Sequence, residues 1–488
     1  MSDLRMRPVE RKQYFMETIS LEDMAAEDDT VRAIWAFVER LDLTAYYNKI
    51  KSKVNEAGSP AYNPKVLLAM WIYAYSQGIS SAREVEKLSR EVRNWRWLCG
   101  DQPINYHTLS DFRIGHKEEL DELFTNSLGV LSAEGLVTLE RVTQDGTKIR
   151  ANAGIDTFRG EEKLKAHLKT AREQVELLSN PESEPVTKRI NKAKERAVVE
   201  RCSKLEQAVQ EYEKLKADKK KKENIRVSTT DPESRVMKQS NGGYNPSYNA
   251  QIAVDTANKI IVGKHASSNC EDTQELKPMV ESINKELGKY PKQVITDGGY
   301  NTYPNIKMAA EKDIDLISAE RGNNNVSGQQ YQKRGVTKEF ESEVFKYDED
   351  LRGMICPEGK TLKFDGKEEL PGRTNFKYRA KAEDCNKCSS KSKCCPEATK
   401  KGRSVIRKEY QEDIIEFQEK MRTEEAKSIC KKRGENAEFV NACIKERFKL
   451  RQFRLRGLSK VDIEVTFAAL AYNIMRWFRL RWYPALAV

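Results

Sequence analysis

The sequence contains no long uncharged apolar run. Its most apolar segment, residues 461–478, includes Asp462, Glu464 and Arg476, so it indicates a buried helix and not a membrane span. The opening residues, MSDLRMRPVERKQ, also lack the apolar stretch of a signal peptide. We therefore expect no membrane role and a cytoplasmic location.

The composition also favours a globular chain over a disordered one. Charged residues make up 33% and the mean hydropathy is -0.74, yet 38% of the residues are hydrophobic. With 488 residues the chain exceeds the usual size of one hydrophobic core, so we expect two or three structural units. The formal net charge of +11 is compatible with DNA or RNA as a partner, although many basic proteins bind no nucleic acid.

The ten cysteines do not indicate a disulfide framework, because the expected compartment is reducing. Five of them lie between Cys356 and Cys395, where CPEGKTL and CNKCSSKSKCC place one C-x-x-C unit between single cysteines. This spacing suits a structural, tetrahedral zinc ion, and free thiols are the equal alternative. The candidate ligands are Cys356, Cys385, Cys388 and Cys394, with Cys395 able to replace its neighbour. The others are expected to be core or surface thiols: Cys99, Cys202, Cys270, Cys430 and Cys443.

The first 135 residues have the periodicity of helices punctuated by Gly and Pro. The helical stretches are PKVLLAMWIYAYSQG, SSAREVEKLSREVRNWRWLCG and HTLSDFRIGHKEELDELFTNSLGVL. Asn63 and Ser80 or Ser81 are suitable helix starts. Polar residues on or beside the third stretch would suit a DNA groove, or are ordinary solvated side chains: Tyr106, His107, Arg113 and Lys117.

Residues 136–345 mix strand and helix signals. LVTLERVTQDGTKIRANAG combines β-branched residues with a Gly-containing turn, so one strand is expected to end near Asp145 and another to begin soon after. YNAQIAVD and KIIVGKHAS predict a hairpin around Asn258, followed by a helix over residues 272–287. YPKQVITDGGY then predicts a short strand ending in Asp297, and a helix and the strand DIDLISAE follow. This alternation indicates a mixed α/β sheet.

A segment inside this region, residues 161–223, predicts a helical hairpin. It is rich in Lys, Glu, Ala, Leu and Gln, has no Gly, and has Pro only at Pro181 and Pro185. We therefore interpret it as an insertion. After the cysteine region the sequence returns to helix.

Paired carboxylates at strand ends suit phosphodiester chemistry. Cleavage with two metal ions needs carboxylates that converge on ions about 3.5 to 4 Å apart. Asp145 and Asp297 each follow β-forming residues and precede Gly, so both side chains would emerge at one sheet edge. For either residue alone, a turn is the alternative interpretation.

A third carboxylate is expected from the helix in CKKRGENAEFVNACIKERFKLRQFRLRG. Glu438, Asn441 and Lys445 stand at i, i+3 and i+7, so they share one helical face. A metal-binding Glu and a phosphate-binding Lys would then point toward the same DNA. The competing candidates for the third carboxylate are Glu435, Glu446 and Glu464.

These segments together resemble a known enzyme family. DGTKIRAN and TDGGY are similar to the first and second signature segments of the RNase H-like DDE transposases. Arg433, Glu438 and Lys445 match the tyrosine, arginine, glutamate, lysine signature of insertion-sequence transposases. Cys430 takes the place of the tyrosine, which removes one DNA contact, and the Arg to Glu spacing is one residue longer than in some relatives. RLRGLSKVDIEVTFAALAYNIMRWF resembles the closing segment of the family.

The resemblance implies an RNase H-like mixed sheet with flanking helices, interrupted by the helical hairpin and a cysteine-rich module, plus an all-α DNA-binding domain. It implies cleavage at transposon ends and transfer of the 3′-hydroxyl into target DNA, with two Mg²⁺ or Mn²⁺ ions at Asp145, Asp297 and Glu438. The implied partners are the terminal inverted repeats, the target DNA and a second copy of the chain, in a bacterial, nucleoid-associated setting. The implied DNA contacts are Arg433, Asn441, Lys445, Arg454, Arg456, Arg113 and Lys117.

The corresponding domains are a helical DNA-binding domain (1–135), a split catalytic domain (136–345 and 400–488), the hairpin insertion (158–228) and the cysteine-rich module (346–399). Two other functions compete with transposition. A domesticated or degenerate DNA-binding regulator would show no Mg²⁺-dependent nicking, and a metal-dependent nuclease would release cut ends without joining them.

Overall fold

The computed structural model describes residues 11–486, except for 13, 15, 17, 54–58, 180–187, 219–223, 320–333, 371–372, 397–400 and 409–410. It divides into two compact units. The first comprises Met1–Val130, Arg447–Lys449 and Phe467–Val488, and the second comprises Leu131–Glu446 and Leu450–Thr466.

The first unit is helical, as expected. Asn63 caps the most buried helix by accepting a hydrogen bond from the backbone N–H of Lys65 at 3.0 Å. Two expected helices are each broken in two: Val92 adopts extended backbone and His116 also leaves the helical conformation. The helices are α1 (Thr30–Val38), α2 (Thr44–Asn48), α3 (Pro64–Ser76), α4 (Ala82–Glu91), α5 (Arg93–Leu98), α6 (Tyr106–Gly115) and α7 (Lys117–Ala133), the last of which continues into the second unit.

The core of the first unit surrounds α3, which is buried on nearly every side. The Trp71 indole N–H donates to the Leu109 carbonyl at 2.9 Å, and the Tyr75 ring stacks on Phe467 with centroids 5.4 Å apart. Phe467 lies on a helix near the C-terminus, α17 (Leu458–Trp477), so this helix contributes to the core of the first unit. The expected assignment of all of residues 400–488 to the catalytic domain therefore differs from this compact unit.

The second unit is built on a mixed sheet with the strand order β4-β5-β1-β7-β8, in which β6 also pairs with β5. β5 is antiparallel to β1, β4 and β6, whereas β7 is parallel to β1 and β8. The strands are β1 (Arg141–Arg150), β4 (Arg235–Lys238), β5 (Tyr244–Asp255), β6 (Ile260–Ser267), β7 (Gln293–Thr296) and β8 (Asp315–Ser318). The expected hairpin around Asn258 is confirmed as β5 and β6.

One strand prediction was wrong, because β1 does not end at Asp145. It runs without interruption from Arg141 to Arg150, with Gly146 opposite Gln251 of β5. The Asp-Gly pair therefore lies inside a strand instead of in a turn. The glycine is required by close packing, since an added Cβ would lie 2.4 Å from Asp272 Oδ1.

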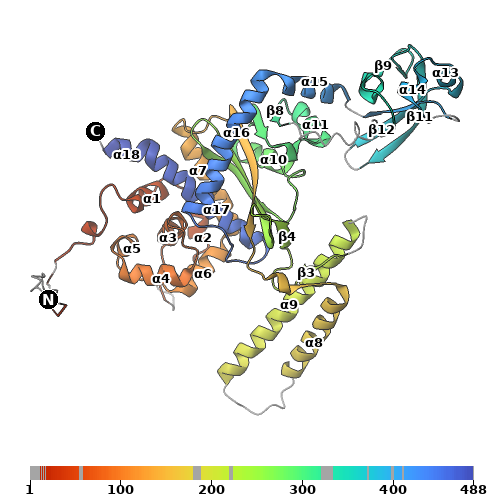
Figure 1. Ribbon diagram of the computed structural model, residues 1–488. Helices are drawn as coiled ribbons and strands as arrows, with labels where there is room; N and C mark the ends of the chain where they lie inside the picture. The colour runs from red at the N-terminus through yellow and green to blue at the C-terminus, as the bar shows by residue number, and fades with distance from the viewer. Residues whose placement is uncertain are drawn as a thin grey trace, which may run out of the picture. The chain divides into compact units, whose positions relative to one another are not determined.

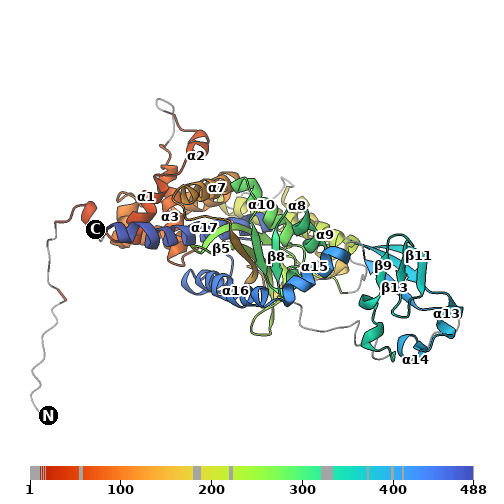
Figure 2. The same ribbon diagram turned by 90° about the horizontal axis from the view of Figure 1, so that it is seen from above.

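Helices cover both faces of this sheet. Figure 2 shows α10 (Leu276–Leu287) and α16 (Glu424–Ala442) on opposite sides of it. α10 packs on β6, and α16 packs on β1, β5, β7 and β8. The other helices are α11 (Tyr303–Glu311), α15 (Gln411–Arg422) and α17 (Leu458–Trp477), of which the first turns, through Thr466, belong to this unit. Among the described residues no helix has the length and apolar character needed to cross a membrane.

The expected helical hairpin is present as α8 (Glu161–Ser179) and α9 (Lys188–Asp218), which lie side by side (Figure 1). Leu168, Ala171 and Leu205 form part of the contact between them. The connection that contains Pro181 and Pro185 lies outside the described residues. The short strands β2 (Phe158–Arg159) and β3 (Val227–Ser228) pair at the base of the hairpin, which explains how a long insertion begins and ends at one place.

The cysteine region forms a small antiparallel sheet with the order β13-β12-β11-β10-β9. Its strands and short helices are β9 (Lys346–Asp348), β10 (Gly353–Ile355), β11 (Thr361–Leu370), β12 (Arg373–Arg379), α13 (Ala382–Asn386), α14 (Lys391–Cys394) and β13 (Ser404–Lys408). Its core also includes Val336 and Val405, which lie outside the expected bounds of 346–399.

Candidate active site

Asp145 and Asp297 come from neighbouring parallel strands. β1 and β7 pair with Thr143 opposite Ile295, and each aspartate stands two residues further along its own strand direction. Continuing this register places the two aspartates level with each other, with side chains on the same face of the sheet. Adjacent strands lie about 4.8 Å apart. The sheet therefore brings together two carboxylates that are far apart in sequence.

The electrostatics of Asp145 reflect this position. Its side chain is only 19% exposed, and burial raises its pKa to about 6. The guanidinium of Arg433 lowers the pKa, whereas the carboxylates of Asp297 and Asp272 raise it. Asp145 is thus a partly desolvated acid that faces other acids. Such a group gains stability from a nearby cation.

Asp297 begins the loop after β7. Its Oδ1 accepts a hydrogen bond from the backbone N–H of Gly299 at 2.8 Å, which fixes the turn TDGGY. Its carbonyl accepts from the Ser318 hydroxyl at 2.8 Å, which ties the loop to β8. The expected strand end at Asp297 is confirmed, and the loop geometry follows from the Asp-Gly-Gly sequence.

Helix α16 contributes side chains to Asp145. Asn441 Nδ2 donates to Asp145 Oδ2 at 3.1 Å, and Arg433 Nη1 lies 3.6 Å from Asp145 Oδ1. Arg433 Nη2 also lies 4.0 Å from Glu438 Oε1, so the guanidinium stands between the two carboxylates. Among the described residues, Arg433 Nη1 and Asn441 Oδ1 are buried without a hydrogen-bond partner. These are polar atoms that a bound ion, water or phosphate would satisfy.

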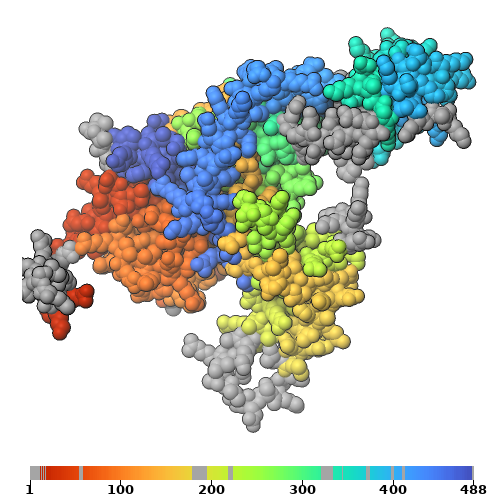
Figure 3. All heavy atoms as spheres, in the orientation of Figure 1, coloured from red at the N-terminus to blue at the C-terminus, as the bar shows by residue number. Residues whose placement is uncertain are grey.

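Glu438 is on α16 but does not join the two aspartates. Its side chain is 72% exposed and folds back along the helix toward Gly434, where an added Cβ would lie 3.0 Å from Glu438 Oε1. α16 forms part of the outer surface in the space-filling view (Figure 3). Within the described part of the chain, no group of three or more His, Cys, Asp or Glu side chains is arranged to hold a metal ion.

Lys445 follows α16 in a π-helical turn, Cys443–Arg447, so the expected i to i+7 spacing is not that of a regular α-helix. Burial lowers the pKa of Lys445, with a further contribution from Arg451, while Asp145 opposes the shift. The lysine is therefore close enough to Asp145 to share its electrostatic field. A π-turn at this place changes the direction in which the lysine leaves the helix.

The competing glutamates have other surroundings. Glu446 is exposed and pairs with Arg451, and Glu435 is an exposed residue of α16. Glu464 is fully buried, and its Oε1 accepts the backbone N–H groups of Arg454 at 2.8 Å and Leu455 at 2.6 Å. Its carboxylate is thus used to hold a loop.

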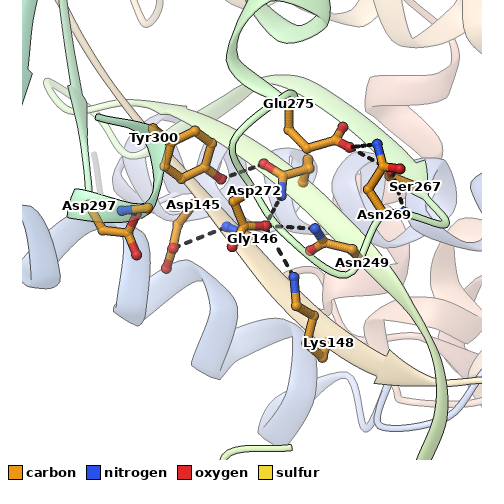
Figure 4. Close-up of polar contacts among 12 residues, drawn as sticks. Asp145, Gly146, Lys148, Asn249, Ser267, Asn269, Asp272, Glu275, Asp297 and Tyr300 are labelled. Carbon is orange, nitrogen blue, oxygen red and sulfur yellow. Dashed lines mark hydrogen bonds and ion pairs between the residues drawn. The ribbon is translucent and has the colours of Figure 1, made fainter. Parts of the chain in front are cut away.

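The face of β1 opposite Asp145 carries a second polar network that the sequence did not reveal (Figure 4). Asp272 Oδ1 accepts from Asn249 Nδ2 at 2.6 Å, Gln251 Nε2 at 2.7 Å and Lys148 Nζ at 3.1 Å. Nearby, Tyr300 donates its hydroxyl to Gln251 Oε1 at 2.6 Å. The alternating polar residues Asn249 and Gln251 in a buried strand were the available signal.

The candidates in the helical unit differ in accessibility. Arg113 is buried: Nη1 donates to the Ser80 carbonyl at 2.8 Å, and the guanidinium lies 4.2 Å from the Trp71 ring centroid. Its charge is used inside the core, because a buried guanidinium needs such partners, so we do not propose it as a DNA contact. Lys117 pairs with Asp121, and His107 is exposed at the start of α6.

Arg454 and Arg456 are both exposed, in the turn that precedes α17. Arg456 Nε donates to the Asn152 carbonyl at 2.9 Å, and Asn152 Nδ2 donates to the Arg454 carbonyl at 2.6 Å. The turn is thereby tied to the end of β1. Its outer side carries the two guanidinium groups.

The five clustered cysteines border one cavity in the small sheet. They are Cys356, Cys385, Cys388, Cys394 and Cys395. Burial raises the pKa of Cys394 to about 12; Arg403 opposes this shift and neighbouring thiols reinforce it. Backbone N–H groups of Lys360 and Arg403 donate to the sulfurs of Cys356 and Cys385 at 3.2 and 3.4 Å. These described thiols converge on the cavity without adopting the geometry of a metal site.

Comparison with known families bears on both units. A family model described as "Transposase DDE domain" matches residues 355–478, and one described as "Transposase domain (DUF772)" matches residues 19–114. The chain is a relative of the insertion-sequence DDE transposases. A search of curated proteins gave no match. The resemblance noted from the sequence is therefore confirmed.

Only some of the candidate residues of this transposase relative lie inside the matched regions. The DDE match contains Arg433, Glu438 and Lys445, whereas Asp145 and Asp297 lie before it. The second match covers the helices from α1 to most of α6. Members of this family are generally enzymes that act on DNA in transposition, and they use divalent metal ions.

Proposed function

We propose that this transposase relative cleaves DNA at transposon ends with two divalent metal ions and then transfers the 3′-hydroxyl into target DNA. The proposed metal ligands are Asp145, Asp297 and Glu438. The observation that carries the proposal is the parallel register of β1 and β7, which leads to Asp145 on β1 and to Asp297 directly after β7, beneath a helix that supplies Arg433 and Asn441.

The sheet supports an RNase H-like catalytic domain. Taking β1, β5, β6, β7 and β8 as strands 1, 2, 3, 4 and 5 gives the spatial order 3-2-1-4-5, with the first three antiparallel and the last two parallel to strand 1. Asp145 on the central strand and Asp297 after its neighbour then lie where the resemblance to DDE transposases expects two acids. The helical region 1–135 is proposed to bind the terminal repeats.

The residues fit a pair of hard cations in part. Two carboxylates stand side by side, one of them with a raised pKa, and carboxylate oxygens are the ligands that Mg²⁺ and Mn²⁺ prefer. When bound, the ions would activate the attacking oxygen and stabilise the leaving oxygen. Glu438 would complete the set only after its side chain turns from Gly434 toward Asp145. Both Arg433 contacts would have to change for this to happen.

The chain's own residues have separate tasks in this proposal. Arg433 screens Asp145 and Glu438 from each other, and it would turn to a DNA phosphate when the metal ions bind. Asn441 orients the Asp145 carboxylate through its hydrogen bond. Lys445, partly buried and close to Asp145, would hold the scissile phosphate in line. Two copies of the chain, one for each transposon end, are expected in the DNA complex.

The test uses the purified full chain, the DNA that flanks its coding region, and a target plasmid. Transposition predicts Mg²⁺- or Mn²⁺-dependent cleavage at the flanking repeats and plasmid products joined to them. Cut ends without joined products would favour a nuclease, and repeat binding with no cleavage at any metal concentration would favour a regulator. Either result would refute the proposed activity.

We also propose that the cysteine cluster binds one structural zinc ion. Support comes from five thiols that border one cavity, from the raised pKa of Cys394, to which burial and the neighbouring thiols contribute, and from N–H groups aimed at two of the sulfurs. Ligands would have to move into tetrahedral geometry. Elemental analysis of protein purified with reductant should find about one zinc per chain.

The matched zinc variants use two pairs of cysteines. Cys385→Ser with Cys388→Ser should remove the zinc, and Cys202→Ser with Cys270→Ser, outside the cluster, should retain it. Absence of zinc from the unmodified chain would show that the cluster consists of free thiols.

A further inference from the structure

The segment Arg454–Leu458, here called the basic loop, is held by hydrogen bonds to three side-chain carboxylates. Glu464 accepts the N–H groups of Arg454 and Leu455. Asp231 Oδ1 accepts the N–H of Gly457 at 3.0 Å, and Glu233 Oε2 accepts the N–H of Leu458 at 2.8 Å. Four backbone N–H groups of five residues therefore end on side-chain carboxylates from separate parts of the chain.

Two of these carboxylates are expensive to bury. Asp231 and Glu464 are fully buried, and burial raises the pKa of Asp231, although hydrogen bonds from Tyr248 and the Gly457 N–H oppose the shift. The Tyr248 hydroxyl donates to Asp231 Oδ1 at 2.6 Å. A well-packed apolar group would usually fill such a place at lower free energy. Their presence indicates that the conformation of the loop, and not only the stability of the core, is what they provide.

The basic loop is also fixed to the strand that carries Asp145. The Phe453 N–H donates to the Arg150 carbonyl at 2.9 Å, and the Arg150 N–H donates to the Arg451 carbonyl at 3.2 Å. Asp145 and Arg150 are five residues apart on β1, which is about 16 Å at about 3.3 Å per residue. That length corresponds to about five base pairs at about 3.4 Å each.

We propose that the basic loop is a rigid DNA-backbone clamp about five base pairs from the scissile phosphate, and that Asp231, Glu233 and Glu464 are its positioning residues. The proposal rests on the proposed function. Arg454 and Arg456 project from the exposed side of the loop and contact phosphates. The carboxylates beneath fix the backbone, so the two guanidinium groups lose little conformational entropy when DNA binds.

The test measures DNA affinity and local hydrogen exchange in the full chain. The probe is a fluorescein-labelled duplex of random sequence, titrated at several salt concentrations. Arg454→Gln with Arg456→Gln should weaken binding roughly tenfold at low salt and lower the salt slope by about two, because each phosphate contact contributes about 0.9. Unchanged affinity in a chain that still cleaves DNA would overturn the clamp while leaving the proposed activity intact.

The positioning role is tested with Glu464→Gln and Glu233→Gln. Glutamine keeps an oxygen acceptor but loses the charge that strengthens the hydrogen bonds, so folding should persist. Amides of the basic loop should exchange at least tenfold faster, and DNA affinity should fall by less than in the double arginine variant. In the double arginine background, Glu464→Gln should cause no further loss of affinity.

Asp462→Asn is the matched control. Asp462 lies on α17, as Glu464 does. It accepts the Ala266 N–H at 2.9 Å and pairs with Lys264 at 3.1 Å, so it holds β6 and not the basic loop. It should destabilise the protein without changing exchange in the loop or the salt slope. An equal loss of DNA affinity in Asp462→Asn, or an additive loss for Glu464→Gln in the arginine background, would reduce the carboxylates to a general stabilising role.

Discussion

The carboxylates around Asp145 and those beneath the basic loop differ in how far their oxygens are satisfied. Asp145 accepts one hydrogen bond on each oxygen, from the Gly146 N–H at 3.0 Å and from Asn441 at 3.1 Å, and Glu438 lies 4.0 Å from Arg433. Glu464 accepts two backbone N–H groups at 2.8 and 2.6 Å and is fully buried. The first set has capacity left for a ligand, whereas the second set is committed to the fold.

This contrast explains how residues of one chemical type take different roles within one unit. A buried carboxylate whose oxygens accept backbone N–H groups holds the backbone in place. A carboxylate that faces other carboxylates and one guanidinium is destabilised until a cation arrives. The partners of each oxygen therefore separate a candidate catalytic acid from a structural one.

The largest effect expected from this contrast is on catalysis. Asp145→Asn and Asp297→Asn should each lower the rate of DNA cleavage by roughly a thousandfold or more, because each removes metal-binding charge at nearly constant volume. Glu438→Gln should do the same, although its side chain is exposed in this conformation. The double aspartate variant should be little worse than either single one. DNA affinity should remain nearly unchanged in all of them.

The controls for cleavage are the other glutamates. Glu446→Gln and Glu435→Gln change exposed side chains and should cleave normally. If Glu446→Gln or Glu435→Gln abolished cleavage in folded protein while Glu438→Gln remained active, the third ligand would be wrongly assigned and the aspartate pair would stand.

The second effect is on the pH dependence of stability. The pKa of Asp145 is about 6 in the folded chain, whereas an unperturbed aspartate has a pKa of 3.8. Between these values the folded state holds more protons than the unfolded state, so the free energy of unfolding falls as pH rises and levels off above pH 6. A rise in pKa from 3.8 to about 6 corresponds to about 3 kcal/mol, at about 1.4 kcal/mol per pH unit.

Urea unfolding of the full chain at several pH values measures how the free energy of unfolding depends on pH. Asp145→Asn should be more stable than the unmodified chain at pH 7 by up to about 3 kcal/mol, and the difference should shrink toward pH 4. Glu438→Gln, which alters a side chain that is 72% exposed, should change stability little. Equal stability of Asp145→Asn and the unmodified chain at pH 7 would mean that the charge of Asp145 does not destabilise the folded state.

The third effect is a loss of stability, opposite in sign to the gain expected for Asp145→Asn. Glu464→Ala should lower the free energy of unfolding by about 1 to 3 kcal/mol, because two partly buried backbone N–H groups lose their carboxylate acceptor. The same measurement separates the two sets, because replacing the proposed catalytic acid Asp145 should raise stability and replacing the structural acid Glu464 should lower it. A Glu464→Ala variant as stable as the unmodified chain would contradict the structural role.

Much of the fold could be predicted from the sequence, because its signals are local. The hairpin of β5 and β6 follows from alternating apolar residues, and the α3 start follows from Asn63-Pro64. The break at Val92 and the continuity of β1 through Gly146 could not be predicted, since they depend on packing. Gly146 looks like a turn residue until Asp272, distant in sequence, is seen against it.

The members of the candidate site could be proposed from the sequence, whereas their arrangement could not be predicted. Asp145, Asp297 and Arg433 were found from motifs, and the parallel register of β1 and β7 brings the aspartates level. The Glu438 carboxylate occupies the space that a Cβ at Gly434, four residues earlier, would restrict, and no sequence pattern predicts this direction. Asp231 and Glu233 were missed because a hydrogen bond to a loop more than two hundred residues away leaves no periodic signal.

The smallest expected effect is the response of stability to magnesium. If Asp145 and Asp297 have capacity for a cation, Mg²⁺ binds the folded chain and not the unfolded one, and at ten times its dissociation constant it adds about 1.4 kcal/mol. This would raise the melting temperature by a few degrees at constant ionic strength. Asp145→Asn with Asp297→Asn should abolish the increase, whereas Glu464→Gln should retain it, since Glu464 already accepts two N–H groups. Glu438→Gln should reduce the increase only if Glu438 turns toward the ions without DNA present. An undiminished increase in the double aspartate variant would mean that magnesium binds elsewhere, and the contrast between open and committed carboxylates would then lose its chemical basis.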